Sequence, residues 1–211
     1  MQKFERLDTI ACPLPLANLD TDQLLPARFL KRPRAEGYGG FLLHDLRFGA
    51  DGKGTSRLPL DEPRYRGAQA IVARRNFGSG SSREGAVYAL MDFGIRCVIA
   101  PSFGDIFASN CVMNGLLVIR LPETEVEELL ALPDLLQARP MRIDLEAQRV
   151  SCGPVSFAFD IDPLRKTKLL NGWDDIDITL SHAAEIARFT AADAKERPWA
   201  LPHRPASDLS R

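Results

Sequence analysis

The sequence predicts a single α/β domain, in which a parallel sheet continues into a smaller antiparallel part to give a mixed β/β/α architecture. Two observations predict it. The middle of the chain alternates short apolar runs with helix-like runs, and three further strand-like runs joined by tight turns follow. Strands that alternate with helices over short connections are typical of parallel α/β sheets. At 211 residues the chain is long enough to build one large apolar core.

The composition excludes several classes of protein. Hydrophobic residues make up 45% and charged residues 26%, and 27 lysines and arginines nearly balance 28 aspartates and glutamates. This balance gives no global field that would attract nucleic acid or an acidic membrane. No apolar run reaches the roughly 20 residues that span a bilayer, and the first residues lack the apolar core of a signal peptide. We therefore expect a cytoplasmic protein that binds neither nucleic acid nor membranes.

The cysteines and histidines lack the spacing of a metal site. No CxxC pair occurs, and the three histidines are scattered. We therefore expect no zinc or iron–sulfur site in this chain. In a reducing cytoplasm the thiols are expected to be small buried hydrophobes and not disulfides. The four are Cys12, Cys97, Cys111 and Cys152.

The elements of the first two thirds can be placed in order. Residues 1–66 are rich in proline, glycine and arginine, which predicts short strands joined by sizeable loops. Short apolar runs then predict buried strands at residues 69–74, 97–100 and 116–119. Between these strands we expect two helices, each closed by the glycine that follows it, at residues 83–93 and 105–114. Thr124 and Glu127 form a capping-box pattern that predicts another short helix.

The last third predicts a different arrangement. Three strand-like runs with tight turns predict antiparallel strands at residues 141–146, 149–152 and 155–159. A helix is expected to start at Asp162-Pro163 and to end at Gly172. Ser181 is predicted to cap a last amphipathic helix that reaches about Ala194. We therefore predict one domain over residues 1–194 and a loose, proline-rich tail over residues 195–211.

The stretch from Asn76 to Glu84, Asn-Phe-Gly-Ser-Gly-Ser-Ser-Arg-Glu, is the most informative for chemistry. It lies between a predicted strand and a predicted helix, where free backbone N–H groups and the helix dipole favour an anion. Gly78 and Gly80 would let the backbone approach a ligand closely. A dinucleotide loop is disfavoured because the third glycine of that motif is missing, and a P-loop is excluded because no Gly-Lys-Ser/Thr follows.

Two interpretations of this stretch remain open from the residues alone. Ser81 followed by Glu84 fits a capping box, which would make Ser81 a structural N-cap. Ser81 could equally face a ligand, and the two roles do not exclude each other. Arg83 favours a ligand, because a cation in the first turn of a helix opposes the dipole and predicts an anionic partner. Its planar guanidinium matches a carboxylate or a phosphate with two hydrogen bonds.

Five blocks in order carry a resemblance to a known family. They are Asn18–Pro26, Asn76–Glu84, Ala100–Phe107, Phe159–Asp162 and Leu169–Ile176. Over about residues 3–190 the chain resembles the small subunits of 3-isopropylmalate dehydratase, which are similar to the swivelling C-terminal domain of aconitases. The resemblance implies a single swivelling domain that works with a separate large subunit. That partner is expected to carry a [4Fe-4S] cluster, whose open iron acts as a Lewis acid on the substrate hydroxyl.

The resemblance also implies roles for individual residues. Ser81 would be the base that removes a proton alpha to a carboxylate of a small diacid, and Arg83 would hold a substrate carboxylate. Gly80 and Ser82 belong to the same substrate-binding turn. Arg28 is a further candidate, because the substrate-selecting loop of the family lies near residues 26–38. The implied reaction interconverts 2- and 3-isopropylmalate by dehydration and rehydration in leucine biosynthesis.

The chain departs from the family pattern at several positions. Ser79 stands for a usual cysteine and Gly85 for a usual histidine, and Leu46 and Tyr88 stand for usual tryptophans. Two alternatives therefore stay open: a paralogous hydro-lyase for a related 2-hydroxy diacid of the citramalate/methylmalate or homoaconitate type, or a non-catalytic anion-binding module.

Three other features have structural interpretations. The acids of Asp20-Thr21-Asp22 lack the further ligands of a calcium loop, so we expect a structural Asx turn there. His44 and His182 are expected to be surface or turn residues.

Overall fold

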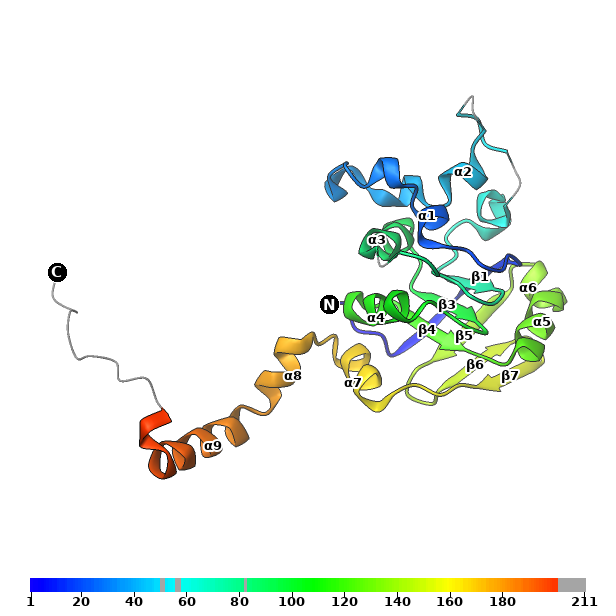
Figure 1. The fold of residues 1–211 in the computed structure, drawn as a ribbon. Helices are drawn as coiled ribbons and strands as arrows, with labels where there is room; N and C mark the ends of the chain where they lie inside the picture. The colour runs from blue at the N-terminus through cyan, green and yellow to red at the C-terminus, as the bar shows by residue number, and fades with distance from the viewer. Residues whose placement is uncertain (50–51, 56–57, 82, 201–211) are drawn as a thin grey trace. The chain divides into compact units, whose positions relative to one another are not determined.

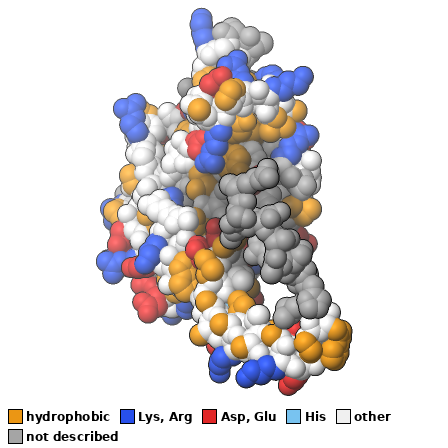
Figure 2. All heavy atoms as spheres, turned by 90° about the vertical axis from the view of Figure 1, so that its left-hand side faces the viewer, with side chains coloured by type: hydrophobic (Ala, Val, Ile, Leu, Met, Phe, Trp, Pro, Cys, Tyr) orange, Lys and Arg blue, Asp and Glu red, His pale blue; other side chains and the backbone are white. Residues whose placement is uncertain are grey.

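The computed structural model of the chain describes residues 1–49, 52–55, 58–81 and 83–200. The chain divides into two compact units, Met1–Trp173 and Asp174–Arg211. No helix in the described part of the chain is long and apolar enough to cross a membrane. Basic and acidic side chains are interspersed over the face shown in Figure 2, in keeping with their nearly equal numbers.

The first unit is built on a mixed sheet, whose strands follow the order β4-β3-β2-β1-β5-β6-β7 (Figure 1). They are β1 (Arg6–Leu14), β2 (Ala70–Ala73), β3 (Cys97–Ala100), β4 (Leu117–Arg120), β5 (Pro140–Asp144), β6 (Arg149–Cys152) and β7 (Val155–Ala158). Strand β1 joins the two halves, because its last residues pair parallel with β2 and its first residues pair antiparallel with β5. Strands β2 to β4 continue in parallel, and β5 to β7 continue antiparallel. The predicted mixed sheet is confirmed.

Both faces of the parallel half are covered by helices, which explains why its strands are continuous apolar runs. The helices of this unit are α1 (Thr21–Leu24), α2 (His44–Arg47), α3 (Glu84–Phe93), α4 (Asp105–Asn114), α5 (Glu123–Ala131), α6 (Pro133–Leu136) and α7 (Pro163–Asn171). Side chains alternate between the faces of a strand. In β2, Ile71 joins a core with α3 and α4, whereas Val72 joins a second core with α5 and α6.

The predicted helix ends in this unit are largely confirmed. Helices α3 and α4 end at Gly94 and Gly115, whose φ angles of 108° and 84° are costly for other residues. The Asp162 side chain caps α7. The predicted capping box of Thr124 and Glu127 is wrong, because the N-cap position of α5 is Pro122, two residues before Thr124, and no side chain caps the helix.

The second unit contains α8 (Asp175–Ser181), α9 (Ala183–Glu196) and a 3-10 turn at Pro198–Ala200. Asp174 caps α8, and its carboxylate accepts the backbone N–H of Asp177 at 2.9 Å. The prediction that Ser181 caps the last helix is wrong, because Ser181 ends α8 and its hydroxyl donates to a carbonyl of that helix. Helix α9 also runs past Ala194 to Glu196, since the nearest helix-breaking residue is Pro198. Residues 201–211 of the predicted tail lie outside the described residues.

Candidate functional site

Three of the five blocks meet at the carboxyl end of the parallel strands, in the loops that follow β1, β2 and β3 (Figure 1). Backbone hydrogen bonds join these loops. Gly78 N–H donates to the Leu19 carbonyl at 2.7 Å, and Thr21 N–H donates to the Ser79 carbonyl at 2.9 Å. Phe77 N–H donates to the carbonyl of Ser102 in the third loop at 3.0 Å. This end of a parallel sheet is where ligands commonly bind.

The glycine-rich turn after β2 packs tightly against α4. Gly78 has a φ of 69°, and a Cβ atom on it would lie 2.2 Å from Cγ of Phe107. Phe77 is fully buried, with its ring 5.6 Å from the ring of Phe107. The expectation that Gly78 makes room for a ligand is therefore incomplete, because the space beside it is filled by Phe107. Gly80 has a φ of 90°, and a Cβ atom on it would lie 3.6 Å from Cβ of Asp20, so it is the more open of the two.

Ser81 lies at a hollow of about 270 Å³ beside the first turn of α4. Its neighbours around the hollow include Gly80, Asp105 and Ile106. The Ser81 carbonyl accepts the Thr21 hydroxyl at 2.8 Å and the Arg83 N–H at 2.8 Å. Among the described residues, no hydrogen bond engages the Ser81 hydroxyl, and the residue is exposed. The structure thus holds Ser81 by its backbone and leaves its hydroxyl free for a ligand.

The prediction that Ser81 is an N-cap is wrong. Helix α3 begins at Glu84, its N-cap position is Arg83, and no side chain caps it. The Glu84 carboxylate accepts from the side-chain amide of Asn114 at 2.8 Å instead of folding back. The reason is the bond between Thr21 and the Ser81 carbonyl, which keeps residue 81 in the turn and lets the helix start three residues later. Ser82, predicted to be in the substrate-binding turn, lies outside the described residues.

Arg83 has an anionic partner within the chain. Its Nη1 atom pairs with a carboxylate oxygen of Asp22, and its side chain is 28% exposed. Arg83 precedes the helix and does not lie in its first turn, so the argument from the helix dipole alone was wrong about its position. Asp22 lies in the first turn of α1, where a negative charge is favourable. A guanidinium carries five N–H donors, so Asp22 leaves Arg83 with donors for a second carboxylate.

The Asp20–Asp22 turn is structural, as predicted. Asp20 caps α1, because its carboxylate accepts from Gln23 N–H at 2.7 Å while the Gln23 side chain accepts from Asp20 N–H at 3.0 Å. The part of the chain that the structure describes contains no group of three His, Cys, Asp or Glu side chains that could hold a metal ion. Its four cysteines are free and buried.

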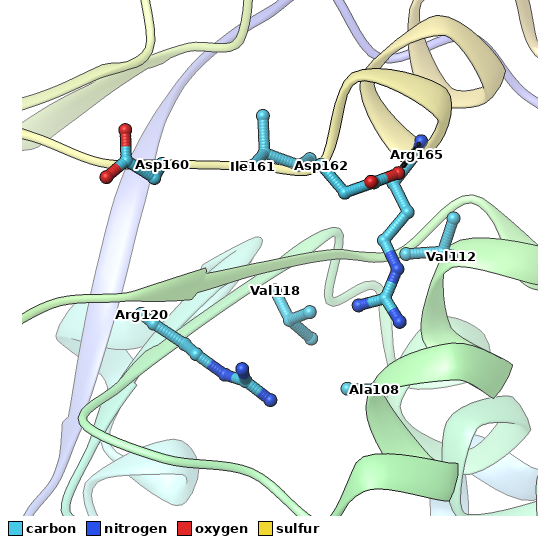
Figure 3. A pocket seen from close by; sticks show the side chains of 8 residues that line it. All are labelled: Ala108, Val112, Val118, Arg120, Asp160, Ile161, Asp162 and Arg165. Atoms are coloured by element: carbon cyan, nitrogen blue, oxygen red, sulfur yellow. Dashed lines mark hydrogen bonds between the residues drawn. The ribbon is translucent and has the colours of Figure 1, made fainter.

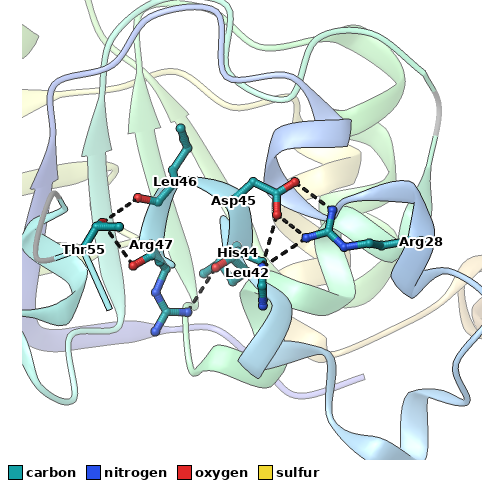
Figure 4. Close-up of polar contacts among 7 residues, drawn as sticks. All are labelled: Arg28, Leu42, His44, Asp45, Leu46, Arg47 and Thr55. Carbon is teal, nitrogen blue, oxygen red and sulfur yellow. Dashed lines mark hydrogen bonds and ion pairs between the residues drawn. The ribbon is translucent and has the colours of Figure 1, made fainter. Parts of the chain in front are cut away.

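Arg28 lies at a different hollow, which it lines with His44, Asp45 and Phe48. Its guanidinium pairs with both oxygens of Asp45 and lies 3.2 Å from Nδ1 of His44 (Figure 4). This hydrogen bonding lowers the pKa of Asp45 to about 2. The structure therefore does not bring Arg28 into the hollow of Ser81. Sequence reasoning missed Asp45, which lies beside His44 at the start of α2.

The space beside Gly85 is filled by Leu25 and by Leu30 of the loop of residues 26–38. A Cβ atom on Gly85 would lie 2.9 Å from Cδ2 of Leu25 and 3.0 Å from Cδ2 of Leu30. The loop therefore packs directly on the first turn of α3, next to Arg83. Leu30 itself is 37% exposed.

Known proteins match most of the chain. A family model for the aconitase C-terminal domain matches residues 1–124, and a model for the C-terminal domain of 3-isopropylmalate dehydratase small subunits matches residues 175–202. A 3-isopropylmalate dehydratase small subunit of Rhodospirillum centenum is 46% identical over 202 residues, covering 95% of this chain and 100% of that protein. One of Parvibaculum lavamentivorans is 45% identical, covering 94% and 100%.

A solved structure agrees in fold. The crystal structure of a 3-isopropylmalate dehydratase from Methanocaldococcus jannaschii superposes with a TM-score of 0.62 at 22% identity, covering 87% of this chain and 98% of that one. The chain shares the fold of that structure, and together with the family model for the aconitase C-terminal domain this confirms the predicted fold class. Since the curated relatives are matched over their whole length, the chain belongs to the family of 3-isopropylmalate dehydratase small subunits.

Proposed function

We propose that this chain closes the active site of a 3-isopropylmalate dehydratase, which interconverts 2- and 3-isopropylmalate by dehydration and rehydration in leucine biosynthesis. One observation carries the proposal. Loops that are far apart in the sequence meet at one end of the sheet, where the hydroxyl of Ser81 is free at the hollow and Arg83 follows two residues later in the chain. A hydroxyl and a guanidinium from one turn suit a substrate that loses a proton next to a carboxylate.

Each of the two side chains has its own task. Ser81 removes the proton alpha to a carboxylate, and the alkoxide this requires must be stabilised by nearby positive charge. Arg83 lies two residues away and supplies that charge, while its remaining donors bind a substrate carboxylate. The ion pair with Asp22 fixes the direction of the guanidinium before substrate binds.

The site is completed by the large subunit. A [4Fe-4S] cluster is proposed for that partner, and the support for it is membership of the family of 3-isopropylmalate dehydratase small subunits, which resemble part of the aconitases. When bound, the cluster supplies a Lewis acid for the substrate hydroxyl. This chain then covers the reacting diacid with the turn of residues 78–81 and the start of α4.

Reconstitution tests the proposal. The chain, the cognate large subunit and their mixture are assayed anaerobically with 3-isopropylmalate. Turnover in the mixture alone supports the proposal, and turnover by the isolated chain would refute it. Citramalate and homoaconitate serve as competing substrates, because a higher kcat/KM for either would assign the paralogous activity. A folded complex that turns over none of the three would identify a non-catalytic module.

A further inference from the structure

Two arginines face a second hollow on the first unit, next to the candidate site. Figure 3 shows the guanidinium groups of Arg120 and Arg165 pointing into this hollow from two sides, with Val118 between them. The hollow has a volume of about 170 Å³. It lies where the end of β4, the helix α4 and the start of α7 meet, and Val112 and Ala108 of α4 form its apolar wall.

The positive charges in this hollow lack strong partners. Among the described residues, the guanidinium of Arg165 makes no hydrogen bond or ion pair, and Arg120 pairs only with Asp105, at 3.6 Å. The Asp105 side chain is 99% exposed, so this pair is weak. Asp162 is already engaged as the cap of α7, where it accepts the Arg165 backbone N–H at 3.0 Å. The Asp160 carboxylate points away from both guanidinium groups in Figure 3.

The hollow is also lined by Asp160 and Asp162, but neither carboxylate pairs with the two guanidinium groups. Two weakly paired cations directed at one hollow repel each other, and an anion between them would offset the repulsion. A carboxylate is the best match, because guanidinium groups bind it with two parallel hydrogen bonds. The apolar wall of the hollow adds a preference for a carboxylate that is carried on an aliphatic stem, as in a glutamate or aspartate side chain.

The place of the hollow indicates where that carboxylate comes from. Arg120 is the last residue of β4, so it lies at the same end of the parallel sheet as the turn that carries Ser81. Asp105 connects the two places, because it lines the Ser81 hollow and pairs with Arg120. Exposed apolar side chains flank both, with Ile106 56% and Leu164 52% exposed. A protein that covers the Ser81 hollow therefore reaches the arginine pair across the first turn of α4.

We propose that Arg120 and Arg165 form a clamp for an acidic side chain of the large subunit. The inference rests on the proposed function, since the large subunit is the protein expected to cover the Ser81 hollow. Ile106 and Leu164 then pack against apolar neighbours of that acid. Such a clamp is a docking device that sets affinity and orientation, and it does not take part in the reaction.

The test measures association of the full-length chain with the cognate large subunit. We compare the wild type with Arg120→Gln, Arg165→Gln and the double variant. The matched control is Arg66→Gln, which removes an exposed arginine that precedes β2 at the opposite end of the sheet. Each single variant should raise the Kd about tenfold and the double variant more, while the control should leave it unchanged. Arg165→Lys should restore part of the affinity. Added salt should weaken the wild type more than the double variant.

Activity separates docking from catalysis and from the proposed function. At saturating large subunit, kcat of the double variant should equal that of the wild type, and a lasting loss of kcat would overturn the docking role. An unchanged Kd in the double variant would overturn it as well. A third contrary result is stabilisation of the isolated wild-type chain, but not of the double variant, by free isopropylmalate, which would mark a small-molecule site. If the wild-type complex assembles but does not turn over isopropylmalate, the proposed function fails while the Kd comparison still decides the clamp.

Discussion

Replacing Ser81 by alanine separates a structural role from a catalytic role for this residue. An N-cap serine contributes about 0.5–2 kcal/mol to stability. Ser81 does not make that contribution, because Arg83 occupies the cap position and the hydroxyl of Ser81 has no hydrogen bond among the described residues. The carbonyl of Ser81, which holds the turn to Thr21, is unchanged in alanine. Ser81→Ala should therefore change the free energy of unfolding by less than about 0.5 kcal/mol.

The effect on catalysis should be much larger. Removing a general base typically lowers the rate about 100- to 10,000-fold, which corresponds to roughly 3–5 kcal/mol in the activation barrier. The assay is kcat for isopropylmalate isomerisation by the reconstituted complex, with urea unfolding of the isolated chain measured in parallel. Ser79→Ala is the matched control, because Ser79 is in the same turn but does not line the hollow. A Ser81→Ala complex with near-normal kcat would remove Ser81 from the mechanism. A stability loss of about 1 kcal/mol or more would contradict the structural argument.

Four further predictions concern the site and the core. Arg83→Lys keeps a charge next to Asp22 but loses the planar fork, so kcat/KM should fall about tenfold to a hundredfold; steady-state kinetics that match the wild type would refute the carboxylate clamp. Arg83→Gln should destabilise the chain by up to about 1 kcal/mol in urea unfolding, since it breaks the partly exposed ion pair with Asp22. If Arg83 lay within the first turn of the helix, removing its charge would be expected to stabilise the chain instead. Gly78→Ala should cost at least about 2 kcal/mol because its Cβ would overlap Phe107, whereas Gly80→Ala, with open space, should cost less; equal losses would show that the overlap does not matter. Burial raises the pKa of Cys12 to about 12, while an unfolded thiol ionises near about 8.5. Below the unfolded pKa, ionisation of this thiol does not lower the free energy of unfolding. Above it, the free energy of unfolding falls by about 1.4 kcal/mol per pH unit, because only the unfolded chain loses the proton. Urea titrations between about pH 8 and pH 11 should show a shallower fall for Cys12→Ala than for the wild type, and equal slopes would contradict the sign.

Local signals in the amino-acid sequence were enough to predict the elements of the parallel half and much of the fold. The strand Cys97–Ala100 and the helix Asp105–Asn114 have the predicted boundaries. They depend on signals within a few residues: β-branched apolar runs favour strands, and a glycine that adopts a positive φ ends a helix. The alternation of such elements then predicts the mixed sheet, since few arrangements can bury continuous apolar strands on both faces.

The site depends on contacts that no local signal contains. The Thr21 hydroxyl and the Ser81 carbonyl are 60 residues apart in the sequence, and Arg83 is 61 residues from Asp22. The pattern Ser-Ser-Arg-Glu favours a cap when only its neighbours are considered. In the folded chain the Thr21 hydroxyl donates to the Ser81 carbonyl, and residue 81 lies in the turn before the helix. Likewise, Arg120 and Arg165 stand on separate elements, and only the packing of α7 against α4 brings their charges to one hollow. Local propensity acts within a turn or two, whereas ion pairs and long-range hydrogen bonds form only once the chain has folded.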